Sequence, residues 1–182
     1  MLVMDCQRSI LEALTPVDRE RVLQNVSRAL QAARAANMAV FYVVVQFRDG
    51  YAEVAPRNTL FSQVKQNGAL RQSQDNAQVC PEVAPLPGEP VVIKKRIGAF
   101  TGSDLEVLLR SRGIDTLVLT GVSTLGVIES TARQAFDMDY RVFVLGDCCA
   151  DRNPEDSALA LARFLPRIST VCPVDEFIAG IA

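Results

Sequence analysis

The feature that most constrains the fold is the alternation of short apolar runs with helix-forming segments. Uncharged runs rich in β-branched residues occupy residues 38–45, 91–93 and 116–119. Runs that are apolar on both faces are typical of parallel strands buried between two layers of helices. We therefore predict an α/β fold, a three-layer, doubly wound and mostly parallel sheet of about six strands with helices on both faces. A chain of 182 residues fits a single domain spanning 1–182.

Recognisable start signals mark the helices between these strands. Thr15 and Pro16 suit the N-cap and first position of a helix over residues 16–36. Ser103 and Glu106 have the spacing of a capping box, which predicts a helix that begins there. Gly121 predicts a turn from a strand into a helix that runs towards Asp139. The remaining predicted elements are strands at 2–5, 141–145 and 169–172, a helix at 58–66, a helix from Asn153 and a short C-terminal helix.

Charge and cysteine content exclude several classes of protein. The net charge is -2, so nothing indicates a nucleic-acid partner or an anionic membrane. The longest apolar run, 38–45, is too short to span a bilayer, and Asp5 interrupts any signal peptide. We therefore expect a cytoplasmic protein with a small-molecule substrate. Its five cysteines contain no CxxC pair and are expected to be free thiols.

The chain contains no histidine, which excludes Ser-His-Asp and Cys-His catalysis and imidazole metal sites. Other polar residues follow the predicted strands, where parallel sheets bind their ligands. They are Asp5, Gln46, Arg48, Lys94, Lys95, Arg96, Ser123, Thr124 and Asp147. Each has a plain structural alternative as a turn cap, a solvated charge or a helix cap. Together, an aspartate and a lysine in a partly buried cleft indicate acid–base chemistry.

Two further segments carry expectations. The N–H groups that begin the helix near Ser123 to Val127 suit an anion or a developing oxyanion. The residues from Gly121 to Gly126 match neither GxGxxG nor GxSxG, so a dinucleotide site and a serine-hydrolase elbow are set aside. Residues 47–90 form a long, proline-broken connection, which indicates a lid or a subunit contact, or alternatively a disordered insert.

Three segments resemble the isochorismatase-like hydrolase family, also called cysteine hydrolases. Residues 2–7 resemble its first strand, which ends in Asp-x-Gln. Residues 92–100 resemble its Lys-x-Arg-x-Ser-Ala-Phe segment, with Gly98 where the family often has serine. Residues 120–131 resemble its Thr-Gly-Val-x-Thr-x-x-Cys-x-x-Ser-Thr segment. Element order and loop placement agree over nearly the whole chain.

The resemblance implies catalytic positions. Most members use an Asp-Lys-Cys triad, onto which Asp5 and Lys94 fall, with register favouring Lys94 over Lys95. The cysteine position is Val127, which cannot attack a carbonyl group. The chain is in this respect similar to the isochorismatases proper, which lack the cysteine and cleave a vinyl ether after the aspartate protonates it. Cys6, Cys148 and Cys149 are not expected to replace the missing thiol.

The resemblance also implies binding positions. The substrate-binding residues are predicted to be Gln46, Arg57, Arg96, Phe100, Ser123, Thr124, Gly126 and Val127, with Arg57 and Arg96 holding a substrate carboxylate. The nicotinamidase branch binds a metal through Asp and His, so a chain without histidine is expected to have neither metal nor cofactor. Members are commonly dimers or larger, so a homo-oligomer is expected. They often have a non-proline cis peptide just before the position of Ser123.

Three functions remain open. The first is a metal-independent hydrolase of a small carboxylated molecule, with acid catalysis by Asp5 assisted by Lys94. The second is a family member without activity that binds a metabolite or a protein. The third is an amide hydrolase that uses water directly. An acid–lysine pair at the rim favours the first over the second, and Val127 favours the first over the third.

Overall fold

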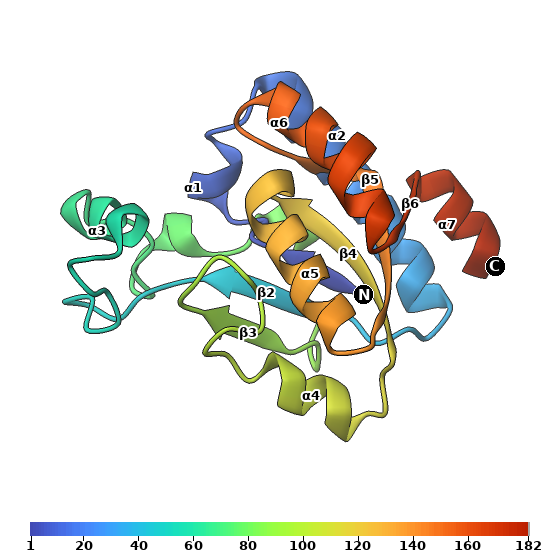
Figure 1. Cartoon of the computed structure of the whole chain (residues 1–182), viewed down its shortest axis with the longest axis horizontal. Helices are drawn as coiled ribbons and strands as arrows, with labels where there is room; N and C mark the ends of the chain where they lie inside the picture. Colours follow the sequence, from blue (N-terminus) through green and yellow to red (C-terminus); the bar gives the residue numbers. More distant parts are fainter. Residues whose placement is uncertain (182) are drawn as a thin grey trace.

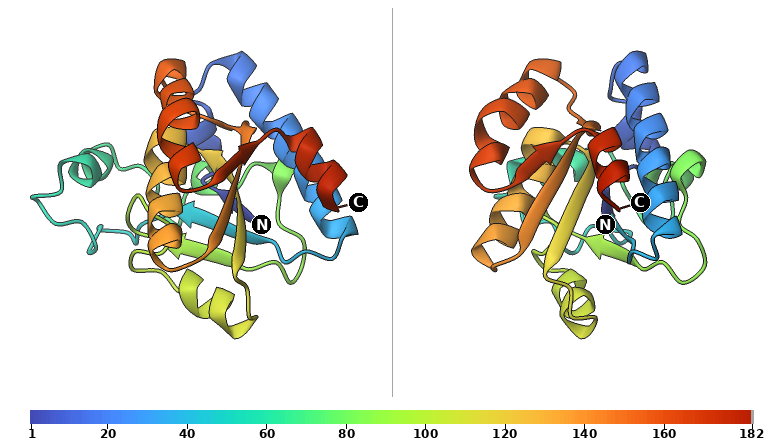
Figure 2. Two further views of the ribbon diagram at one scale, coloured as in Figure 1. Left: turned by 45° about the vertical axis from the view of Figure 1, so that its right-hand side comes forward. Right: turned by 90° about the vertical axis from the view of Figure 1, so that its right-hand side faces the viewer.

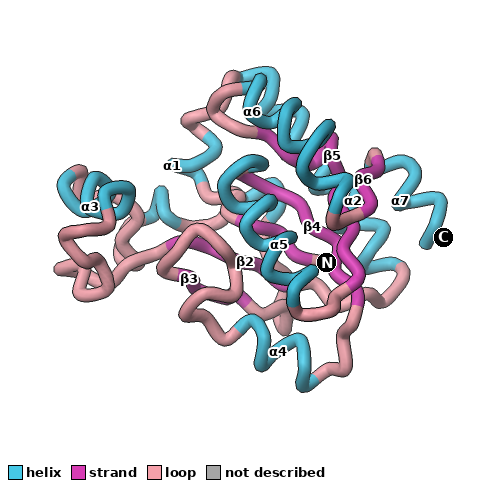
Figure 3. Tube along the Cα trace, in the orientation of Figure 1, coloured by secondary structure: helices cyan, strands magenta, loops and turns pink. Residues whose placement is uncertain are grey.

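The structure is a computed structural model that describes residues 1–181. Within that part of the chain, six parallel strands form one sheet in the order β3-β2-β1-β4-β5-β6 (Figures 1 and 3). They are β1 (Leu2–Met4), β2 (Phe41–Val45), β3 (Val91–Lys94), β4 (Thr116–Val122), β5 (Arg141–Ala150) and β6 (Thr170–Cys172). The strand order reverses between β1 and β4, as in doubly wound folds. The predicted fold class is confirmed.

Two layers of helices cover the sheet (Figure 2). On one face lie α2 (Pro16–Ala35) and α7 (Val174–Ile181). On the other face lie α4 (Leu105–Ser111), α5 (Glu129–Asp137) and α6 (Pro154–Leu159). Successive strand side chains point to opposite faces, so Val3 packs in the α2 layer while Leu2 and Met4 pack in the α5 layer. This explains why the strands are apolar on both sides.

The predicted start of α2 is confirmed, whereas that of α4 is wrong. The Thr15 side chain accepts a hydrogen bond from the Asp18 N–H at 3.1 Å, with Pro16 at the first position. In α4 the N-cap is Asp104, and the Ser103 hydroxyl donates to the Ala99 carbonyl at 2.6 Å. Glu106 lies 3.8 Å from Arg110 one turn further along, so the capping box does not form. The Ser103 oxygen accepts the Leu105 N–H at 3.2 Å in place of the Glu106 N–H that the box requires.

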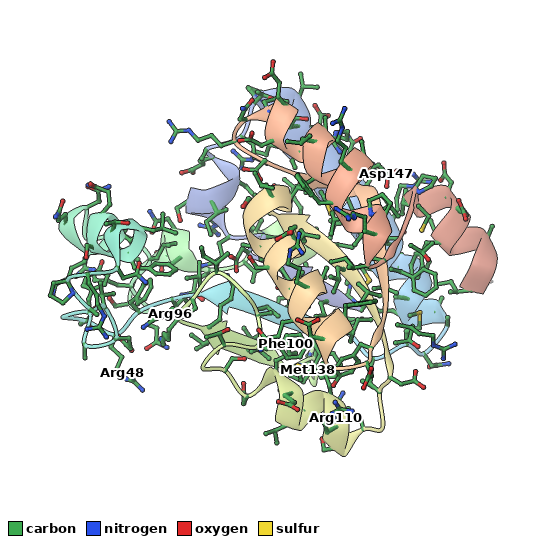
Figure 4. The ribbon with its side chains drawn as sticks, in the orientation of Figure 1. Arg48, Arg96, Phe100, Arg110, Met138 and Asp147 are labelled. Atoms are coloured by element: carbon green, nitrogen blue, oxygen red, sulfur yellow. The ribbon has the colours of Figure 1, made fainter. Side chains whose placement is uncertain are left out.

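Strand β5 is longer than predicted. It continues past Leu145 to Ala150 and pairs again with β4 after a register shift. Asp147 therefore lies inside the strand, and its Oδ1 accepts the Val174 N–H at 2.9 Å (Figure 4). This aspartate holds the start of α7, and it is not part of the ligand-binding rim.

Residues 47–74, here called the arm, project from the carboxyl end of β2 and contain α3 (Thr59–Gln66; Figure 1). The arm has a small apolar cluster of its own, in which the Phe47 and Phe61 ring centroids are 5.3 Å apart. The helix α1 (Arg8–Leu11) lies near its base. Residues 47–74 are therefore a folded segment and not a disordered insert, and the lid or subunit contact stays a prediction. None of the helices in residues 1–181 combines the length and the apolar character needed to cross a membrane.

Candidate active site

A cavity of about 240 Å³ opens at the carboxyl ends of β1 and β4, the point where the strand order reverses. One side, here called the sheet wall, consists of Asp5, Val45, Lys94, Ile97, Val122, Ser123, Gly126 and Val127. The other side, here called the arm wall, consists of Leu60, Phe61, Val64 and Leu70, with Ile10 beside them. The predicted residues Asp5, Lys94, Ser123, Gly126 and Val127 are thus brought together on one wall.

Asp5 and Lys94 form an ion pair on the sheet wall. The Asp5 Oδ2 and Lys94 Nζ atoms are 2.8 Å apart, and the two side chains are 3% and 1% exposed. Burial raises the pKa of the Asp5 carboxyl above its usual range, while the charge of Lys94 opposes that rise. Asp5 Oδ1 has no hydrogen-bond partner among the described residues. A carboxyl group in this environment can hold a proton and deliver it to a ligand.

The backbone after β3 holds the Lys94 ammonium in place. Besides Asp5, Lys94 Nζ donates to the carbonyl oxygens of Arg96 at 3.1 Å and Ile97 at 2.8 Å. All three donors of the ammonium group are therefore used. Lys95 points elsewhere, with its Nζ 3.6 Å from Glu53 of the arm. Of the two adjacent lysines, only Lys94 contacts Asp5, as the register of the sequence predicted.

Strand β4 ends later in the sequence than predicted. It continues through Gly121 to Val122, and the chain turns at Ser123, after a cis peptide bond between Val122 and Ser123. The cis bond agrees with the expectation from the family resemblance. Gly121 is required for a different reason than the turn, because a Cβ there would lie 1.9 Å from the Met4 carbonyl oxygen. The glycine allows β1 and β4 to approach closely beside Asp5.

The prediction that the N–H groups of Ser123 to Val127 are free is wrong for two of them. A π-helical turn (Thr124–Ile128) precedes α5, and the Val127 and Ile128 N–H groups both donate to the Ser123 carbonyl, at 2.8 and 3.0 Å. The Leu125 N–H donates to Asp151 Oδ2 at 2.9 Å. Asp151 follows β5, and no signal in the sequence indicated this partner. Among residues 1–181, the Ser123, Thr124 and Gly126 N–H groups have no recorded partner, so fewer N–H groups than expected are free to bind an anion.

Val127 occupies the wall at the predicted cysteine position. Among the described residues, no cysteine lines this cavity. Cys6 packs against the α2 layer, as predicted, and Cys149 Sγ donates to the Leu145 carbonyl at 3.2 Å. Burial raises the pKa of the Cys149 thiol to about 12. All five cysteines are free and buried, as expected.

Several predicted binding residues do not line the cavity. Gln46 is buried and donates through Nε2 to the Ala77 carbonyl at 2.8 Å, and Arg57 is exposed in the arm. Arg96 lies between the arm and the sheet, where it donates to the carbonyls of Lys95 and Glu53 (Figure 4). Phe100 packs 6.0 Å from the Tyr140 ring near α5. The Thr124 hydroxyl bonds Ser157 at 2.8 Å. Their assignment to substrate binding stays a prediction.

The arm wall was missed as part of the site. The apolar character of Leu60, Phe61, Val64 and Leu70 was visible in the sequence as a surface that must pack on something. Its position opposite Asp5 depends on how the arm folds back, which no local pattern reveals. Residues 1–181 contain no group of three or more acidic or cysteine side chains placed to hold a metal ion.

Known proteins share this fold and sequence. The family model described as Isochorismatase domain matches residues 1–176. The chain is 32% identical over 182 residues to YwoC, an uncharacterized isochorismatase family protein of Bacillus subtilis (strain 168), covering 100% of this chain and 93% of YwoC. It is 33% identical over 174 residues to the ureidoacrylate amidohydrolase RutB of Stutzerimonas stutzeri (strain A1501), covering 88% of this chain and 70% of RutB.

Among solved structures, a cysteine hydrolase from Pseudomonas syringae pv. phaseolicola 1448A has the same fold, with a TM-score of 0.89 at 24% identity. The alignment covers 99% of this chain and 90% of that one. Because the family model matches nearly the whole chain and the relatives match it as well, the chain belongs to the isochorismatase family of hydrolases.

Proposed function

We propose that this protein is a metal-independent hydrolase of a small molecule in which Asp5 is the acid catalyst and Lys94 supports it, without a cysteine nucleophile. The observation that carries the proposal is the buried pair with 2.8 Å between Asp5 Oδ2 and Lys94 Nζ, on the wall of a cavity that includes Val127. Valine offers no nucleophile, so a covalent thioester intermediate is not available at this position.

The chemistry follows from the environment of Asp5. Its raised pKa favours the protonated form, which donates its proton to the carbon of an enol ether. Water then adds to the resulting oxocarbenium carbon and returns a proton to the Asp5 carboxylate. The hemiketal formed collapses to a ketone and an alcohol. Lys94 stabilises the carboxylate between the two proton transfers.

The substrate carboxylate predicted from Arg57 and Arg96 has no support on the cavity wall. Neither arginine lines the cavity, and the three donors of Lys94 are already used. We therefore propose the reaction and the acid catalyst without assigning a charge to the substrate.

A panel of vinyl ethers and small amides tests the proposal with purified protein. Hydrolysis of an uncharged vinyl ether is expected, scored by the release of its carbonyl product, and isochorismate is included as a charged member of the panel, scored by the release of pyruvate. Asp5→Asn should lower the rate at least about 100-fold, because it removes the proton donor. The matched control is Asp137→Asn, an exposed aspartate at the end of α5, which should leave the rate unchanged. Turnover that survives Asp5→Asn would reject Asp5 as the acid.

A second candidate is hydrolysis of an amide or ureido bond by water, with Asp5 as base. The observation in its favour is the similarity to a ureidoacrylate amidohydrolase. The same panel separates the two, because a base must be ionised, so the rate for an amide should rise with pH through the pKa of Asp5. If every vinyl ether and amide stays intact, a binding role without catalysis is favoured.

A further inference from the structure

The composition of the cavity wall restricts the substrate more than the catalytic pair does. Thirteen residues line the cavity, and nine of them are apolar: Ile10, Val45, Leu60, Phe61, Val64, Leu70, Ile97, Val122 and Val127. The polar side chains on the wall are Asp5, Lys94 and Ser123. All three lie on the sheet wall, whereas the arm wall offers only hydrocarbon. A ligand in this cavity therefore contacts polar side chains on the sheet wall only.

Most of the hydrogen-bonding atoms on the sheet wall already have partners. Lys94 donates to Asp5, Arg96 and Ile97, so it binds a substrate anion only by giving up one of these bonds. The polar groups without a recorded partner are Asp5 Oδ1, the Ser123 hydroxyl and the N–H groups of Ser123, Thr124 and Gly126, within the described residues. These groups satisfy one small polar function of a ligand, such as the atoms of a single amide or enol ether.

A second charged group inside the cavity would lack any partner. The two arginines predicted to bind a carboxylate, Arg57 and Arg96, do not line it, and Arg96 already donates to the carbonyls of Lys95 and Glu53. Burying an unpaired carboxylate against Phe61 and Leu70 is strongly unfavourable. The cavity of about 240 Å³ has room for the volume of about eight water molecules, so a second polar group that stays inside it contacts these walls.

We propose that the substrate has one hydrolysable polar group, placed at Asp5, and a short branched aliphatic or single-ring body that packs against Leu60, Phe61, Val64 and Leu70. This inference rests on the proposed function for the position of the reacting group. The arm is then the part of the chain that selects the substrate. It does so by contact with hydrocarbon.

Binding without turnover tests the substrate class. The probes are isovaleramide and malonamide, which have equal numbers of non-hydrogen atoms, and the slightly larger anion succinamate. Their affinities for the full chain are measured by ligand-observed NMR titration. Isovaleramide should bind at least about tenfold more tightly than either polar probe, because its isobutyl group leaves water. Equal or tighter binding of malonamide or succinamate would overturn the inference, and so would failure of all three to bind.

Paired variants locate the preference on the arm. Leu60 is 52% exposed, so Leu60→Asn is expected to fold, and it should reduce the preference for isovaleramide about threefold. The matched control Val107→Asn, at a 69% exposed site on α4, should leave the preference unchanged. Equal effects of the two variants would show that Leu60 of the arm does not contact the ligand. Melting curves of both variants show whether they are folded.

These results are separable from those of the hydrolysis panel. If isovaleramide binds as expected and no compound is hydrolysed, the proposed function fails and the substrate class stands. If hydrolysis depends on Asp5 but the polar probes bind best, the proposed function stands and the substrate class fails.

Discussion

The two walls of the cavity differ in chemistry and in how the chain holds them. The sheet wall carries a buried ion pair whose lysine is fixed by three hydrogen bonds, and it rests on the strands β1, β3 and β4. The arm wall is apolar and belongs to a projecting segment with its own small cluster of side chains. The proposed acid–base pair is held by hydrogen-bonded strand ends, whereas a hydrocarbon group needs only an apolar surface. Changes to the sheet wall should therefore affect stability and reaction together, and changes to the arm should affect selection alone.

The largest effect is expected from breaking the ion pair. Lys94→Met leaves the Asp5 carboxyl buried without its partner, which should cost about 3 kcal/mol of unfolding free energy and remove activity. Urea unfolding measures the loss. The matched control is Lys95→Met, whose ammonium lies 3.6 Å from Glu53 and is partly exposed. It should cost less than about 1 kcal/mol. Similar losses of unfolding free energy for both variants would show that the Asp5–Lys94 pair contributes no more to stability than Lys95 does.

A steric change at the base of the sheet wall should have the next largest effect. Gly121→Ala places a methyl group 1.9 Å from the Met4 carbonyl oxygen, at a backbone φ of 117°. The strands must separate beside Asp5, so we expect a loss of about 2 kcal/mol or more in thermal or urea unfolding. Gly98→Ala is the control, because its nearest neighbour would be 3.7 Å away. An unchanged Gly121→Ala protein would show that β1 and β4 are not so close.

The prediction that Val127 occupies the family's cysteine position can be tested directly. Val127→Cys puts a thiol on the cavity wall, whereas none of the five native cysteines lines that cavity. Iodoacetamide should label the variant at least about tenfold faster than the wild type, since exposure and ionisation control the rate. Mass spectrometry identifies the labelled residue. Labelling no faster than the wild-type background would place Val127 outside the cavity.

The smallest effect is expected in the pH dependence of the unfolding free energy, compared between the wild type and Asp5→Asn. Because folding raises the pKa of Asp5, the folded protein holds this proton more tightly than the unfolded chain does. The free energy of unfolding should then fall as pH rises above about 4, the usual pKa of aspartate, and through the raised value. Asp5→Asn should lack this slope. The two proteins are compared by urea unfolding across pH, and a wild type that gains stability relative to the variant would give the wrong sign.

The same ionisation should appear in the rate. An acid catalyst acts in its protonated form, so hydrolysis of a vinyl ether should decline as pH rises through the raised pKa of Asp5. A rate that rises over this range would instead identify Asp5 as a base and favour the amide hydrolase.

Local sequence patterns were enough to predict the fold class, because strands buried on both faces have to be apolar throughout and the helices between them carry caps such as Thr15. The sequence also placed Asp5 and Lys94 at one edge of the sheet, since the carboxyl ends of parallel strands lie there, here those of β1 and β3 on either side of β2. These are consequences of local pattern and of strand direction.

Tertiary structure alone decided which neighbours compete for each polar group. Ser103 bonds the Ala99 carbonyl, Asp151 takes the Leu125 N–H, and Asp147 holds the start of α7. It also decided that the arm folds back to face Asp5, while the predicted carboxylate-binding Arg57 and Arg96 stay off the cavity wall. Side chains far apart in the sequence meet only when the whole chain is packed, so no local pattern records these partners.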